Sequence, residues 1–120
     1  MTTARELVQL CTEAGPHYQL HINAFIDDFR RANPDERDRI AADGPDVSGR
    51  LEGLVAAVTS ALCRETGTNA PEWLKTIHSP EPFFVFPAKS FALRLRLMLE
   101  SPPAFRIRNV FVPENYLHRA

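Results

Sequence analysis

Residues 48–66, SGRLEGLVAAVTSALCRET, are the best candidate for a core helix. Its large aliphatic residues recur at steps of three and four positions, which is the period of one face of an α-helix: Leu51, Leu54, Val55, Val58 and Leu62. Alanines at positions 56, 57 and 61 leave room for other helices to approach closely. Gly67 follows, and glycine commonly ends a helix just after its last turn. We therefore predict a central helix from about Ser48 to Thr66.

Helix start signals also lie upstream of this stretch. Thr3 and Glu6 fit a capping box, in which the hydroxyl accepts an N–H of the first turn and the carboxylate reaches back. Asn33 followed by Pro34 places an N-cap residue before a proline in the first helical position. Between these two helices, after the Gly-Pro break at 15–16, we predict another helix with this apolar stripe: Leu20, Phe25, Ile26 and Phe29.

The character of the chain changes after Ser79. Prolines at 80, 82 and 87 enclose three phenylalanines and a valine, which predicts an extended, aromatic connection because proline fits poorly inside helices and central strands. Lys89 to Glu100 then returns to a helical pattern that is apolar over most of its circumference, with Arg94 and Arg96 at its flanks. We expect this helix to belong to the core.

The C-terminal stretch SPPAFRIRNVFVPENYLHRA, residues 101–120, begins with two prolines that end the preceding helix. From Phe105 to Val112 the residues alternate, which predicts a short extended segment with Phe105 and Ile107 on one side. We find no second strand of comparable quality in the sequence. Such a segment either lies along the helices or pairs with another chain.

Length and composition indicate a single domain. The chain has 120 residues, of which 44 % are hydrophobic and 24 % charged, as in ordinary globular proteins. Residues 1–79 carry eight Lys or Arg against twelve Asp or Glu, a net charge of -4, whereas residues 80–120 carry six against three, a net charge of +3. We predict an all-α, compact domain over residues 1–120, with five or six helices, an extended proline-aromatic connection and an extended C-terminal segment.

The sequence also bears on where the protein acts. The N-terminus lacks the continuous apolar region of a signal peptide, and no apolar run approaches the roughly 20 residues that cross a bilayer. Cys11 and Cys63 lie far apart in apolar surroundings and predict buried thiols in a reducing compartment. We therefore expect a cytoplasmic protein that does not engage membranes.

The sequence contains no strong catalytic motif. His17 and His21 are four residues apart and could share a helix face as metal ligands do, but HYQLH has no glutamate at the HExxH position. Either cysteine could act as a nucleophile with a histidine, although thiols on apolar helix faces are usually inert. We predict no enzyme, no cofactor and no metal, and rank a small metal-dependent enzyme third among the candidate functions.

The arginines of the C-terminal part are the stronger functional signal. Arg94 and Arg96 flank a helix, and Arg106 and Arg108 alternate with apolar residues in the next segment. Together they would make a patch suited to carboxylates or phosphates. Pairing with the acidic residues 1–79 is the alternative. A DNA-binding regulator is a further candidate, although the chain is not basic overall and shows no basic recognition helix.

Residues 71–120 carry a longer pattern. It comprises a PEWL segment with Trp73, a proline-aromatic stretch at 82–86, a basic helix and a closing series of residues: Ser101, Pro102, Pro103, Phe105, Arg108, Asn109, Phe111, Val112, Glu114, Asn115, Leu117, Arg119 and Ala120. This pattern resembles a group of small bacterial proteins encoded immediately beside nucleotidyltransferase-like proteins in toxin-antitoxin-like gene pairs.

The resemblance implies a non-enzymatic, antitoxin-like partner that binds and restrains a nucleotidyltransferase-like toxin. Aromatic anchors and guanidinium groups suit such a role, and Arg106 or Arg108 would take the place of a metal ion among the toxin's carboxylates. The partner-binding residues expected on this basis are Arg94, Arg96, Phe105, Arg106, Arg108, Asn109, Phe111, Asn115 and Tyr116. The sequence leaves the oligomeric state open.

Overall fold

The chain folds mainly into α-helices, as a computed structural model shows for residues 2–118. The elements, with η for a 3₁₀-helix, are α1 (Ala4–Ala14), η1 (Gly15–His17), α2 (Gln19–Arg31), α3 (Pro34–Ala42), α4 (Arg50–Thr66), η2 (Glu72–Lys75), β1 (Phe83–Phe84), α5 (Phe91–Glu100), α6 (Pro103–Arg106) and β2 (Val110–Phe111). The radius of gyration is 13.5 Å, close to the value of about 14 Å for a compact domain of this length. The predicted all-α class, with six α-helices in the described residues, is confirmed.

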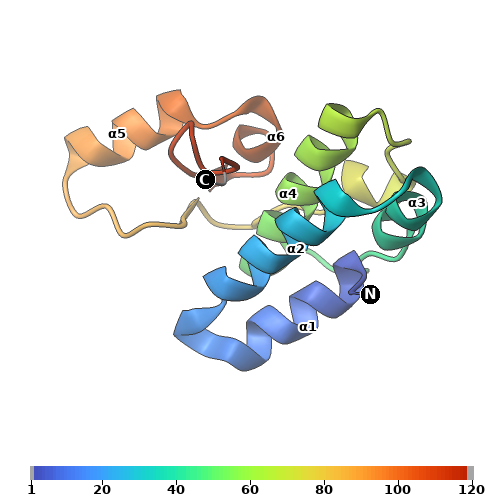
Figure 1. The fold of residues 1–120 in the computed structure, drawn as a ribbon. Helices are drawn as coiled ribbons and strands as arrows, with labels where there is room; N and C mark the ends of the chain where they lie inside the picture. The colour runs from blue at the N-terminus through green and yellow to red at the C-terminus, as the bar shows by residue number, and fades with distance from the viewer. Residues whose placement is uncertain (1, 119–120) are drawn as a thin grey trace.

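Helix α4 lies at the centre of the fold, where α1, α2, α6 and β2 all contact it (Figure 1). Every residue from 53 to 59 is buried, as expected for a helix surrounded by other elements. Gly67 ends the helix in the left-handed conformation, with φ of 72°, as predicted. Neither α4 nor any other helix within residues 2–118 has the length and apolar character needed to cross a bilayer.

The predicted helix starts are present. The Thr3 hydroxyl accepts the Glu6 N–H at 3.3 Å, and the Glu6 carboxylate accepts the Thr3 N–H at 3.0 Å. Asn33 accepts the Glu36 N–H at 2.9 Å, with Pro34 in the first helical position of α3. These side chains satisfy N–H groups that the first turn of a helix leaves unpaired.

The apolar stripe predicted for α2 is wrong at one position. Leu20 is 70 % exposed. At about 100° per residue it lies on the opposite side of the helix from Phe29. The buried face of α2 instead runs through Ile22, Phe25, Ile26 and Phe29.

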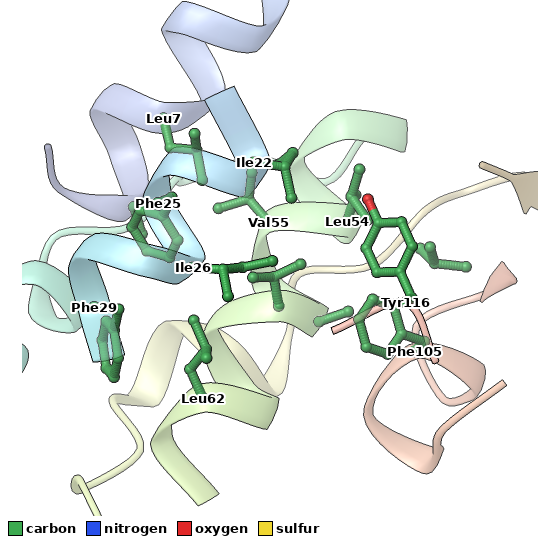
Figure 2. Packing of buried hydrophobic residues seen from close by; sticks show 14 of the residues in the cluster. Leu7, Ile22, Phe25, Ile26, Phe29, Leu54, Val55, Leu62, Phe105 and Tyr116 are labelled. Carbon is green, nitrogen blue, oxygen red and sulfur yellow. The ribbon is translucent and has the colours of Figure 1, made fainter. Parts of the chain in front are cut away.

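One large core joins the acidic and basic parts of the chain. Figure 2 shows Leu7 of α1 and Phe25 of α2 packed on one side of α4, with Phe105 and Tyr116 on another. Leu54 of α4 lies between these groups and is fully buried. The C-terminal residues are therefore integral to the core.

Trp73 fixes the segment after α4 against the end of α3. Its indole N–H donates to the Ala41 carbonyl at 2.7 Å. A Cβ at Gly44 would lie 2.0 Å from the indole ring, so this contact requires glycine there. The tryptophan of the PEWL segment thus has a packing role.

Two extended segments pair with each other. Residues 83–84 and 110–111 form a parallel two-stranded ladder, and the Phe83 N–H donates to the Asn109 carbonyl at 3.0 Å. The prediction of an extended, aromatic connection after Ser79 is confirmed. The sequence shows no obvious strand partner for the C-terminal segment, but the structure provides one in β1 of the same chain. The prolines at 82 and 87 leave β1 only two residues long, which conceals it in the sequence.

Gly53→Ala is expected to destabilise the protein, although alanine is normally the better helix residue by roughly 0.5–1 kcal/mol. A Cβ at Gly53 would lie 2.6 Å from the Ser79 backbone nitrogen and 2.9 Å from the His78 carbonyl carbon. Because these are backbone atoms, residues 78–79 must move away from α4, which costs about 1–3 kcal/mol of unfolding free energy. Urea denaturation followed by circular dichroism measures this loss.

Arg64→Ala is the matched control, because Arg64 is exposed on the same helix. Its unfolding free energy should stay within about 0.5 kcal/mol of the native protein's. A Gly53→Ala protein as stable as this control would contradict the close approach of residues 78–79 to α4.

Candidate functional site

The aromatic residues predicted to bind a partner are mostly buried in their own domain. Phe105 and Tyr116 pack edge to face, with ring centroids 5.7 Å apart (Figure 2). The Tyr116 hydroxyl donates to Gln19 Oε1 at 2.7 Å, and burial raises the pKa of Tyr116. Phe111 is buried against Phe84, with ring centroids 5.1 Å apart. These three side chains are not available to a partner in this structure.

Arg108 is also buried, with 7 % of its surface exposed. Its guanidinium donates to the Ala104 and Leu74 carbonyls, both at 2.8 Å. Desolvation lowers the pKa of Arg108, although a guanidinium in a protein keeps its charge. Arg108 therefore joins η2 to α6, and the predicted surface patch of four arginines does not form.

The alternation predicted for residues 105–112 is wrong in its first half. Pro103 begins a one-turn helix, α6, in which the Ile107 N–H donates to the Pro103 carbonyl at 3.0 Å. Proline favours the first position of a helix as well as ending the preceding one. As a result Phe105 is buried and Ile107 is exposed, rather than both lying on one face.

The other predicted residues of this segment differ in exposure. Asn109 adopts a left-handed backbone conformation, with φ of 63°, and its amide donates to the Ser79 carbonyl at 3.2 Å. Arg106 and Asn115 are exposed. Arg119 and Ala120, at the end of the longer pattern, lie outside the described residues.

Helix α5 is apolar yet lies almost entirely in solvent. Phe91 is 81 % exposed and Leu99 68 %, and Leu93, Leu95 and Met98 are exposed as well. Leu97 is the helix's buried residue, packed with Ala88 and Phe111 in a small cluster apart from the main core. In Figure 1, α5 lies at one edge of the molecule, away from α1 to α4.

The expectation that this helix belongs to the core is therefore wrong. Phe91, Leu95 and Met98 lie on one side of α5, and Leu97 points about 100° or more away from each of them. The helix thus has two apolar sides, and only the Leu97 side packs on the domain. The apolar residues over most of the circumference of α5 indicate that the helix has two contact surfaces. They do not indicate whether the second surface contacts this chain or another protein.

A groove of about 560 Å³ lies beside α5. Four of its lining residues come from α5 and three from the preceding connection: Phe91, Arg94, Leu95, Met98, Glu81, Pro82 and Phe84. It is therefore largely apolar, with one charge of each sign. An apolar groove with few polar groups is the usual form of a binding site.

Arg94 and Arg96 occupy different environments on α5. Arg94 donates its Nε–H to the Ala88 carbonyl at 2.8 Å, and its guanidinium carbon lies 5.8 Å from the centroid of the Phe84 ring. Arg96 instead pairs with Glu100, at 2.9 Å between Nε and the carboxylate oxygen. Only Arg94 lines the groove.

The candidate catalytic residues do not assemble. His17 belongs to η1 and His21 to α2, so they do not share the single helix that the sequence predicts. Within residues 2–118, no three His, Cys, Asp or Glu side chains gather to hold a metal ion. Cys11 and Cys63 are buried, and desolvation raises the pKa of Cys11 to about 12 and that of Cys63 to about 11.

No protein family, curated protein or solved structure matches this chain. Its candidate site is therefore defined by geometry. Among residues 2–118, the exposed side of α5 and the groove beside it form an apolar surface that the domain itself leaves uncovered.

Arg108→Ala is expected to lower the unfolding free energy by about 2–3 kcal/mol, because the Leu74 and Ala104 carbonyls lose charge-assisted hydrogen bonds. Arg106→Ala is the matched control, since Arg106 is exposed two positions earlier and its loss should cost less than about 0.5 kcal/mol. Urea denaturation compares the two variants. Equal stability would contradict the burial of Arg108.

Both thiols are expected to resist 5,5'-dithiobis(2-nitrobenzoate) at pH 8 in the native protein and to react in urea. The raised pKa values keep the folded thiols protonated, whereas an unfolded thiol has a pKa of about 8.5 and supplies the reactive thiolate. Absorbance of the released thionitrobenzoate counts the reacting groups. Rapid reaction of either thiol in the native protein would contradict its inert packing.

Proposed function

We propose that this protein is a non-enzymatic protein-binding module that docks a partner through α5 and the groove beside it. The observation that carries the proposal is the exposure of a whole apolar side of α5, centred on Phe91, Leu95, Met98 and Leu99. Contiguous apolar patches on a domain surface mark interaction sites. A partner that covers such a patch removes its apolar side chains from water, which favours binding.

The anchoring of α5 supports a docking role. Leu97 packs on Phe111, and the Ser101 hydroxyl donates to the Leu97 carbonyl at 2.6 Å. At the other end, Ser90 accepts the Leu93 N–H at 3.1 Å. A helix that is capped at its start and packed on the domain near its end loses little conformational entropy when a partner covers it.

The resemblance of residues 71–120 to antitoxin-like proteins supports a nucleotidyltransferase-like toxin as the partner. In this proposal the cytoplasmic protein restrains the toxin by binding it, and α5 provides the apolar contact. The sequence left Arg106 and Arg108 as alternatives for the contact with the toxin's carboxylates, and we propose Arg106, because Arg108 is buried. Arg106 is exposed and can approach carboxylates of the toxin.

A DNA-binding role has less support. Of the four arginines that would contact phosphates, Arg108 is buried and Arg96 is paired with Glu100. The exposed side of α5 is apolar, whereas helices that enter the major groove present polar and basic residues. We therefore keep protein binding as the proposed function.

Phe91→Ser and Leu99→Ser are expected to abolish co-purification with the product of the neighbouring gene, which this proposal expects to be a nucleotidyltransferase-like protein. Each removes an exposed anchor of the apolar surface, and an anchor at an interface is worth about 2 kcal/mol or more. Co-expression with a tag on the partner, followed by gel filtration, measures complex formation. Point variants are needed because deleting residues 105–120 would remove Phe105, Val110 and Val112 from the core.

Leu20→Ser is the matched control, because Leu20 is as exposed as Leu99 but lies on α2. It should leave the complex intact. All three variants should unfold within about 0.5 kcal/mol of the native protein. Retention of the complex by both α5 variants, or absence of a complex with the native chain, would overturn the proposal.

A further inference from the structure

We infer that the groove beside α5 binds an amphipathic helix of the partner, and that this helix presents a carboxylate to Arg94. The inference rests on the proposed function and specifies the chemistry of the partner's binding element. It follows from the shape of the groove and from the single arginine within it.

The lining of the groove fits a helix. The residues that α5 contributes are Phe91, Arg94, Leu95 and Met98, at positions i, i+3, i+4 and i+7, the spacing through which one helix packs on another. Pro82 and Phe84 extend the apolar lining beyond α5. A volume of about 560 Å³ accommodates several side chains from one face of an incoming helix.

The charge of Arg94 has no counterpart in the described residues. Its guanidinium has five N–H donors, and its hydrogen bond to the neutral Ala88 carbonyl uses one of them. Glu81 also lines the groove, but no ion pair joins it to Arg94 within residues 2–118. An occupant of the groove removes water from Arg94, and burying an unpaired charge is strongly unfavourable. A carboxylate on the occupant satisfies the remaining donors in the planar geometry that guanidinium favours.

The same charge disfavours a second copy of this chain as the occupant. In an antiparallel pair of α5 helices centred on Leu95, each Arg94 lies close to the Arg94 of the other copy. Like charges at an interface oppose association. A partner with acidic residues beside its apolar stripe avoids this repulsion.

Glu81 and Arg94 give the groove one negatively charged and one positively charged residue. A carboxylate placed toward Glu81 is repelled, whereas one placed toward Arg94 is attracted. The orientation of the incoming helix is therefore set by these two residues. Removing the charge of Arg94 should weaken the binding of an acidic helix, whereas removing the charge of Glu81 should strengthen it.

A pair of synthetic helices tests this inference with the full chain. One fluorescein-labelled peptide of about 20 residues, long enough to form a helix, carries Leu at i, i+3, i+4 and i+7 with Glu at the flanking positions. The other carries Lys in place of each Glu. The Glu peptide should bind at least about tenfold more tightly at low salt, and the difference should shrink as ionic strength rises. Fluorescence anisotropy measures both affinities.

Three variants locate the effect. Arg94→Gln should remove the preference for the Glu peptide, and Arg64→Gln, an exposed arginine on α4, should preserve it. Because Arg94 also contacts Ala88, Glu81→Gln provides an independent test: it should strengthen binding of the Glu peptide. Phe91→Ser should weaken binding of both peptides by about tenfold or more.

The possible outcomes are distinct. Equal binding of the two peptides overturns the inference that the occupant presents a carboxylate. It does not overturn the proposed function, which the co-purification experiment tests separately. Failure of both peptides to bind overturns the helical occupant. A concentration-dependent dimer of the chain in sedimentation equilibrium, dissociated by Phe91→Ser, overturns the inference in favour of a second copy.

Discussion

The structure depends on the hydrogen bonds that allow the irregular C-terminal segment to be buried against α4. A buried backbone group without a partner is costly, and this segment is helical only over α6. The Ser101 hydroxyl accepts the Val112 N–H at 2.9 Å, the Arg108 guanidinium donates to the Leu74 carbonyl at 2.8 Å, and residues 110–111 pair with 83–84. These bonds let Phe105 and Tyr116 enter the core.

The same arrangement leaves α5 outside the core. Helices α5 and α6 connect the two strands of the parallel ladder, so the chain leaves the domain after Val85 and returns before Val110. Leu97 and Ser101 hold the end of α5 on this ladder. This end of α5 is therefore held in place, but the side with Phe91 and Leu95 stays exposed among residues 2–118.

The burial of several residues of the longer sequence pattern, in residues 71–120, indicates a structural role for them. Trp73 packs on Gly44, Phe105 is in the core and Arg108 is bonded to the buried Leu74 carbonyl. These residues of the pattern maintain the fold. The apolar residues proposed to contact a partner, such as Phe91 and Leu99, are not among the residues that define the closing part of the pattern.

Capping and periodicity are local, so the sequence was sufficient to predict the helices from α1 to α5 but not the short helix α6. Thr3 with Glu6, Asn33 with Pro34, and the spacing from Leu51 to Leu62 each predicted an element that the structure contains. Tertiary structure alone decided which apolar residues are covered. The pairing of residues 83–84 with 110–111, the burial of Arg108 and the exposure of α5 all depend on contacts between segments far apart in the chain. Hydrophobicity marks a side chain as one that favours burial, but not whether its own domain or another protein buries it.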